Sequence, residues 1–163
     1  PTAGYLFKEK QPERNVDKFK ITKHGLSIAQ IVAAKRGEDI TLEDGEVIPN
    51  SELTYIPYQA RSYAYLSDTA YSAKAAERVH GVDLLYHETT YSTREAMFAK
   101  GRGHSTTIEA AKVAAKAEAK KLIIGHFSSR YKSHDALVEE CRTIFENTEI
   151  AAEGMTFNIE EKR

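Results

Sequence analysis

Residues 82–90 read Val-Asp-Leu-Leu-Tyr-His-Glu-Thr-Thr, a short apolar run that stops at two titratable side chains. An apolar run of this length, bounded by turn residues, predicts a buried strand. Two other segments repeat the arrangement: residues 62–66 are followed by Ser-Asp-Thr at 67–69, and residues 121–125 are followed by His126. Open α/β sheets bind ligands outside the carboxyl ends of their strands. Three runs that each deliver an acid or a histidine at this end predict a single site.

Helices are expected between these strands. The predicted helical segments lie at about residues 72–80, 93–100, 107–120 and 134–146. The third has the capping-box spacing at Thr106 and Glu109 and an alanine-rich body, and both features favour a helix. Strands that alternate with helices predict a layered α/β sheet.

Further elements are predicted outside these alternating segments. They are a strand at residues 4–8, a helix at 27–34, a hairpin at 39–48 and two β-like runs at 150–152 and 155–159. The hairpin rests on the turn pair Asp44-Gly45. The helix rests on Ser27, which can cap its start.

Length and composition indicate one soluble globular domain. The chain has 163 residues, of which 41% are hydrophobic and 29% are charged. No apolar run is long enough to span a bilayer. Cys141 is the single cysteine, which excludes an internal disulfide and a cysteine-rich zinc cluster and fits a reducing cytoplasm. We therefore expect a cytoplasmic protein in which any metal ligands are His, Asp and Glu.

A basic segment lies near the start of the sequence. Residues 8–36 carry eight Lys or Arg residues and three acids, a net charge of +5. They contain few large apolar side chains, so an insertion at about residues 9–37 is expected to project from the body. Such a run is usually a solvated surface, but it can also hold phosphate groups, with Lys18, Lys20 and Lys23 as candidates. The sequence leaves both interpretations open.

Asp68 and His126 are candidate metal ligands. A carboxylate at a strand end can bridge two metal ions, because each oxygen can bind one of them. The alternative for Asp68 is a turn or helix-cap residue, which is common. His126 follows Gly125, which lets the backbone turn, and a neutral imidazole is a good zinc ligand. The alternative for His126 is a histidine packed beneath the following loop.

His104 and Glu88 are candidate catalytic residues. His104 lies just before the helix predicted at 107–120, where it can reach a bound phosphate or act as a general acid. Glu88 is a plausible carboxylate partner, since a neighbouring acid often orients a catalytic histidine. The alternative for His104 is a residue of the capping loop. His87 is expected to support this loop rather than to bind a metal.

Three further residues are candidates for contacting phosphate. Ser105 and Thr106 lie at the start of the same helix, where free N–H groups and the helix dipole favour anions. Arg130 can hold a phosphate through two N–H groups, or it can simply pair with a surface acid.

The motifs occur in a fixed order. They are Ser67-Asp68-Thr69, His87-Glu88-Thr89-Thr90, Gly103-His104-Ser105-Thr106 followed by the alanine-rich helix, and Gly125-His126-Phe127-Ser128-Ser129-Arg130-Tyr131. Together they resemble the motifs of the ribonuclease Z family, the tRNA 3′-processing endonucleases of the metallo-β-lactamase superfamily. The resemblance covers nearly the whole chain, and the order and spacing of the set make it specific.

The resemblance implies a fold and a chemistry. The fold is a four-layer αββα sandwich, and the site holds two zinc ions that activate water for attack on a phosphodiester. Asp68 would bridge the metals and His126 would bind one of them. His104, with Glu88, would protonate the leaving oxygen, and Arg130 would contact phosphate. The basic arm would grip the elbow region of precursor tRNA, and the full-length protein would be a homodimer.

The sequence departs from the family in its metal ligands. The family's His-x-His-x-Asp-His motif is absent, which leaves Asp68 and His126 as the ligands that the resemblance supplies. We therefore expect the C-terminal half of such an enzyme: half of an αββα sandwich, with one sheet face uncovered, that is inactive by itself. The alternatives are a non-catalytic RNA-binding or dimerising module and another hydrolase of this fold that acts on a small phosphodiester.

Overall fold

The computed structural model describes residues 2–161 and divides into two compact units. The sheet unit consists of the chain up to Glu9 together with Arg61–Ile159, and the inserted unit consists of Lys10–Ala60. The prediction of about residues 9–37 for the insertion is therefore too short. Residues 38–60 pack with the basic segment because the buried side chain of Asn50 bonds the backbone carbonyls of Ala34 and Glu38.

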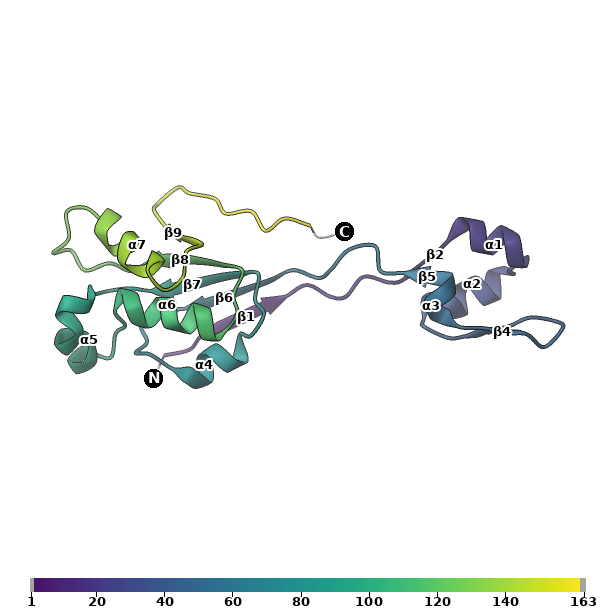
Figure 1. Ribbon diagram of the computed structural model, residues 1–163, viewed down its shortest axis with the longest axis horizontal. Helices are drawn as coiled ribbons and strands as arrows, with labels where there is room; N and C mark the ends of the chain where they lie inside the picture. Colours follow the sequence, from purple (N-terminus) through teal and green to yellow (C-terminus); the bar gives the residue numbers. More distant parts are fainter. Residues whose placement is uncertain (1, 162–163) are drawn as a thin grey trace. The chain divides into compact units, whose positions relative to one another are not determined.

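The sheet unit is built on a five-stranded sheet in the order β1-β6-β7-β8-β9 (Figure 1). The strands are β1 Tyr5–Lys8, β6 Ser62–Leu66, β7 Leu84–Glu88, β8 Lys121–Gly125 and β9 Thr148–Ile150. Strand β1 pairs antiparallel with β6, whereas β6 to β9 are parallel. The register places His87 opposite both Leu66 and Ile124, so β6, β7 and β8 end together at one edge.

Helices connect the parallel strands as predicted. They are α4 Ala73–Arg78, the 3₁₀ turn η1 Thr93–Glu95 with α5 Ala96–Arg102, α6 Thr107–Lys116 and α7 Asp135–Arg142. Helix α6 starts with the predicted capping box between Thr106 and Glu109. Throughout residues 2–161, every helix falls short of the length and apolar character that crossing a membrane requires.

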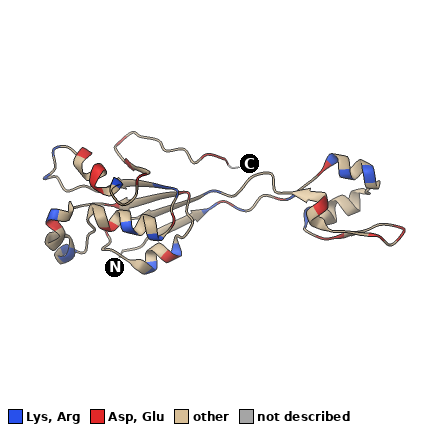
Figure 2. Ribbon diagram, viewed as in Figure 1, with Lys and Arg blue, Asp and Glu red and all other residues tan. Residues whose placement is uncertain are grey.

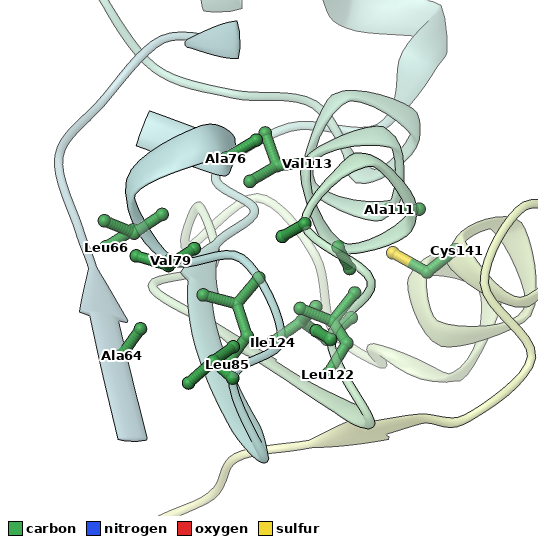
Figure 3. Close-up of a cluster of buried hydrophobic side chains, with 14 of the residues drawn as sticks. Ala64, Leu66, Ala76, Val79, Leu85, Ala111, Val113, Leu122, Ile124 and Cys141 are labelled. Carbon is green, nitrogen blue, oxygen red and sulfur yellow. The ribbon is translucent and has the colours of Figure 1, made fainter. Parts of the chain in front are cut away.

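One face of the sheet forms the main core with α4, α6 and α7 (Figure 3). Leu85, Leu122 and Ile124 point into it and are fully buried, and each such side chain contributes roughly 1.5–3 kcal/mol. Alanines of α6 keep this helix close to the sheet, since they add little side-chain bulk.

The tyrosines on the opposite face of the sheet are only half-buried. Side chains alternate along a strand, so Tyr63, Tyr65 and Tyr86 point away from the helical core. The rings of Tyr65 and Tyr86 stack with centroids 4.6 Å apart. Burial raises the pKa of Tyr86 to about 12. Within the described residues, helices α4, α6 and α7 pack on only one of the two faces of the sheet, as expected for half of an αββα sandwich.

The predicted strands at the end of the chain are partly wrong. The pairing with β8 falls at Thr148–Ile150, and the run 155–159 forms no strand. Gly154 has a φ of 81°, and Met155 N donates to the carbonyl of Ala152, which makes a turn there. The ring of Phe157 then lies 5.7 Å from the ammonium of Lys121.

The inserted unit has a core of its own. Its elements are β2 Asn15–Val16, α1 Lys18–His24, α2 Ile28–Lys35, β3 Ile40–Thr41, β4 Val47–Ile48, α3 Asn50–Leu53 and β5 Thr54–Tyr55. Strand β2 pairs with β5, and β3 pairs with β4 in the predicted hairpin. The fully or nearly buried residues of this core are Val16, Leu26, Ala34, Ile40, Ile48 and Leu53.

Charge is separated within the inserted unit. Residues 10–60 carry seven basic and eight acidic side chains, a formal charge of −1, so the positive charge expected for the insertion is local. Helix α1 carries Lys18, Lys20 and Lys23, whereas the β3–β4 hairpin is acidic (Figure 2). The three lysines of α1 therefore form a local basic surface within the inserted unit.

Glu9 and Arg61 join the two chain segments at which the insertion begins and ends. Arg61 donates to the Glu9 carboxylate through Nε and Nη2, and Glu9 N donates to the Arg61 carbonyl at 2.9 Å. These hydrogen bonds continue the β1–β6 ladder, whose last pair is Lys8 with Ser62. The Arg61 guanidinium holds the pKa of the Glu9 carboxyl below its usual value.

Candidate metal centre and active site

The edge where the parallel strands end brings together Asp68, His104 and His126. A donor atom of each lies within 4.8 Å of donor atoms of the other two. Asp68 follows β6, His126 follows β8, and His104 lies just before α6. Asp68 and His126 thus come from two of the three predicted strand ends, and His104 joins them from the start of α6.

The backbone is strained at two of these positions. Asp68 has a φ of 50° and His126 a φ of 60°, in the left-handed region that side chains with a Cβ rarely adopt. Non-glycine residues are held there when the surrounding structure demands it, and they cluster at functional sites. The strain turns both side chains into the site instead of along the strands.

Glu88 lies beneath this cluster and is fully buried. Its carboxylate accepts hydrogen bonds from Thr69 N at 2.9 Å, Thr90 N at 3.0 Å and Thr90 Oγ1 at 2.7 Å. His104 Nδ1 lies 2.8 Å from Oε1, the oxygen that also accepts from Thr69 N, whereas Thr90 bonds Oε2. A buried carboxylate with this many donors is fixed in place, because losing one of them is costly.

The hydroxyl of Thr90 connects this carboxylate to both imidazoles. Its Oγ1 lies 2.7 Å from Glu88 Oε2, 2.8 Å from His126 Nδ1 and 3.2 Å from His104 Nδ1. A hydroxyl has one proton and a carboxylate only accepts, so the Thr90 proton is donated to Glu88 and the hydroxyl oxygen accepts from the imidazoles. Each neutral ring therefore carries its proton on Nδ1, which leaves Nε2 free for a metal or a substrate atom.

The donor set fits a borderline metal ion such as zinc. His126 Nε2 lies 3.3 Å from Asp68 Oδ1. When a tetrahedral ion has bonds of about 2.0–2.1 Å, its ligand atoms lie roughly as far apart as these two atoms do. Asp68 and His126 would hold the metal, and the imidazole of His104 lies in the same cluster with its centroid 5.3 Å from that of His126.

The other candidate residues of this region have roles within the fold. His87 is buried, its Nδ1 lies 2.7 Å from the Glu88 carbonyl oxygen, and burial lowers its pKa. Ser105 is fully buried and donates to the Thr69 carbonyl at 2.6 Å. Thr106 is the buried N-cap of α6. The predicted phosphate contacts of Ser105 and Thr106 need correction, because both hydroxyls are buried and already bonded.

Arg130 lies at the surface beside the cluster. It forms an ion pair with Glu95 and donates to Ser128 Oγ at 3.1 Å. Its guanidinium carbon lies 5.1 Å from the ring centroid of Tyr91 and 5.3 Å from that of Phe98. The head group is therefore held by one acid and two rings, within reach of solvent.

The sequence reasoning missed Thr90 and Glu95. Thr90 stood in a recognised motif, but nothing in its spacing indicated that one hydroxyl would contact two histidines from distant segments. Glu95 lies 35 positions from Arg130, and an ion pair across that separation depends on the packing of α5.

Comparisons with known proteins agree with this fold. Residues 10–127 match the model of the beta-lactamase superfamily domain. The match covers more than half of the chain, so the chain belongs to this superfamily.

The relatives point to one branch of the superfamily. The chain is 40% identical over 160 residues to a ribonuclease Z of Phocaeicola vulgatus, covering 98% of this chain and 52% of the relative. It is 46% identical over 127 residues to a ribonuclease Z of Anoxybacillus flavithermus, covering 77% of this chain and 41% of the relative. The chain thus spans about half the length of the curated relatives it matches.

Solved structures also resemble this one, among them the two that follow. The metallo-beta-lactamase fold protein YhfI of Bacillus subtilis gives a TM-score of 0.56 at 25% identity, over 60% of this chain and 40% of that one. A long-form RNase Z from yeast gives a TM-score of 0.51 at 29% identity, over 57% of this chain and 13% of that one.

Proposed function

We propose that this chain supplies the proton-donating side and part of the metal site of an endonuclease that matures the 3′ end of precursor tRNA. The cluster of Asp68, His104 and His126 over the buried carboxylate of Glu88 carries the proposal. A protein that only bound RNA would have no need for a strained aspartate and histidine beside an ionisable pair. The 40% identity to proteins named ribonuclease Z supports the choice of substrate.

Each residue of the cluster takes a defined part in this proposal. A bound metal would polarise the phosphodiester and activate the attacking water molecule. Asp68 and His126 hold that metal. His104 donates a proton from Nε2 to the leaving oxygen, and the Glu88 carboxylate at its Nδ1 stabilises the charged ring before transfer. Arg130 offsets the negative charge of the phosphate.

Zinc is the metal we propose, because a carboxylate and an imidazole suit it. Asp68 and His126 are two ligands, which is fewer than two metal ions need, and His104 is kept as the proton donor. A complete two-metal site and cleavage activity would therefore require residues from outside this chain. Helix α1, with Lys18, Lys20 and Lys23, would bind the tRNA backbone, and the complete enzyme would be a cytoplasmic homodimer.

Equilibrium dialysis of the chain against zinc, followed by elemental analysis, tests the metal site. We expect weak binding of at most one ion, which His126→Gln and Asp68→Asn abolish and the surface variant His80→Gln leaves unchanged. Two tightly held zinc ions per chain would contradict the proposal that ligands are supplied from elsewhere. Zinc binding unaffected by His126→Gln would show that the cluster is not the metal site.

Binding of precursor tRNA tests the substrate. The double variant Lys18→Glu/Lys23→Glu should weaken binding and flatten its salt dependence, since phosphate contacts release counterions. The matched double variant Lys112→Glu/Lys116→Glu on α6 should have a smaller effect. Equal losses from the two double variants would exclude helix α1 as a specific tRNA-binding element.

A non-catalytic RNA-binding module is the second candidate. The separation of charge in the inserted unit favours it, because the basic surface of α1 does not depend on a metal. This candidate predicts that His126→Gln leaves RNA binding unaltered and that the chain holds no zinc for the substitution to remove.

A further inference from the structure

A ladder of rings leads from the metal cluster to an exposed aromatic residue on α5. The centroids of His126 and His104 are 5.3 Å apart, those of His104 and Tyr91 are 6.2 Å apart, and those of Tyr91 and Phe98 are 6.5 Å apart. Tyr91 is buried, whereas Phe98 is 53% exposed. The row of rings therefore begins at the candidate metal centre and ends at the solvent-exposed ring of Phe98.

The open end of the ladder carries positive charge. Arg130 lies against both Tyr91 and Phe98, and Arg102 donates to the Tyr91 hydroxyl at 3.2 Å. Residues 93–103 contain three basic side chains and one acid, Glu95, which is ion-paired to Arg130. This local excess contrasts with the formal charge of −1 for the whole chain.

We propose that Phe98 and Arg130 form a subsite for an unpaired ribonucleotide next to the scissile phosphodiester. The base would stack on the exposed ring of Phe98, and the flanking phosphate would lie against the guanidiniums of Arg130 and Arg102. Stacking on an aromatic ring beside cationic groups is how proteins bind single strands with little regard to sequence. This inference rests on the proposed function and assigns α5 to the unpaired part of the substrate.

The pairing of Arg130 with Glu95 fits such a subsite. The acid and the two rings keep the guanidinium in one orientation before ligand arrives, so less side-chain entropy is lost on binding. A duplex would not satisfy the subsite, because its bases are already stacked and cannot reach the face of Phe98.

The absence of tryptophan from the sequence gives a direct test. Phe98→Trp introduces the single tryptophan of the chain at the subsite, and the matched variant Met97→Trp introduces it at the neighbouring position, whose side chain is 89% exposed. A seven-nucleotide unpaired RNA should quench the fluorescence of Phe98→Trp at saturation and leave that of Met97→Trp nearly unchanged. The same sequence as a duplex should bind and quench less.

Affinity measured by fluorescence anisotropy of the labelled RNA completes the test. Phe98→Ala should bind the unpaired RNA about tenfold more weakly, in the range that stacking one base supplies. Phe98→Trp should bind as the natural chain does, and Met97→Ala should bind within twofold of it. Equal losses from Phe98→Ala and Met97→Ala, unquenched Phe98→Trp with bound RNA, or no binding of unpaired RNA would each overturn the subsite.

These experiments distinguish a failure of the Phe98 subsite from a failure of the proposed tRNA substrate. If precursor tRNA binds through helix α1 while Phe98→Trp remains unquenched by its unpaired end, the subsite is wrong and the tRNA substrate stands. If unpaired RNA quenches Phe98→Trp but precursor tRNA binds no better than unrelated RNA, the subsite stands and the tRNA substrate is wrong.

Discussion

Replacing Thr90 with valine removes one hydroxyl while keeping the shape of the side chain. In the structure that hydroxyl donates to the buried carboxylate of Glu88 and accepts from Nδ1 of His126. The variant should lose two things at once: a hydrogen bond to a charged buried group, and the acceptor that fixes the His126 tautomer. The first affects the stability of the fold, and the second affects the metal site.

The size of each effect follows from these contacts. A hydrogen bond to a charged group contributes about 1.5–3 kcal/mol, so the free energy of unfolding should fall by roughly 2 kcal/mol. Loss of the partner that orients a metal-binding histidine typically weakens metal affinity about 10–100-fold. The remaining Glu88 partners, Thr69 N, Thr90 N and His104, keep the carboxylate bonded, so the variant should still fold.

Long-range ¹H–¹⁵N NMR of the imidazoles in the metal-free chain, at a pH where the rings are neutral, reports the tautomer directly. The natural chain and Thr90→Ser should show His126 protonated on Nδ1, whereas Thr90→Val should show a mixture. Thr89→Val is the matched control, since it removes a buried hydroxyl that bonds the Gly125 carbonyl and contacts neither imidazole. A Thr90→Val chain with His126 still fully Nδ1-protonated and zinc affinity within twofold of the natural chain would refute the reasoning.

Three further predictions concern the sheet unit. Burial raises the pKa of Tyr86 to about 12, whereas a tyrosine in an unfolded chain titrates near 10. The unfolded state therefore loses this proton first as the pH rises, and stability to urea should fall between about pH 10 and pH 12. The fall should be less steep in Tyr86→Phe. Burial raises the pKa of the Cys141 thiol to about 12, so it should react with a thiol reagent only as fast as the chain unfolds. Leu122→Ala should cost about 2–5 kcal/mol by urea unfolding, and a loss below 1 kcal/mol would contradict its place in the core.

The sheet unit could be predicted from sequence because its signals are local. The run Lys121–Gly125 is apolar, short and bounded by turn residues, and the strand falls on the predicted residues. The capping box of Thr106 and Glu109 lies within one turn of helix, so its spacing alone predicts the start of α6. The convergence of Asp68 and His126 followed from a general rule about where parallel strands end.

Other features depend on contacts between distant residues. The inserted unit extends to Ala60 because Asn50 and Leu53 complete a core with residues far earlier in the chain, and no local pattern reports this. Helix α1 was missed because it is short, buries no residue and owes its start to a single capping aspartate, Asp17. The hydroxyl of Thr90 reaches His126 across 36 positions, and only the fold brings them together.

The pairing of Glu9 with Arg61 makes the inserted unit a module in the evolutionary sense. The chain leaves the sheet after Lys8 and returns at Ser62, and these two residues are already neighbours in the β1–β6 ladder. A segment inserted between adjacent strand positions can lengthen, shorten or be replaced with little change in the entropy of closing the loop. Selection could therefore exchange the surface between Lys10 and Ala60 for another while the strands that carry Asp68 and Glu88 keep their register.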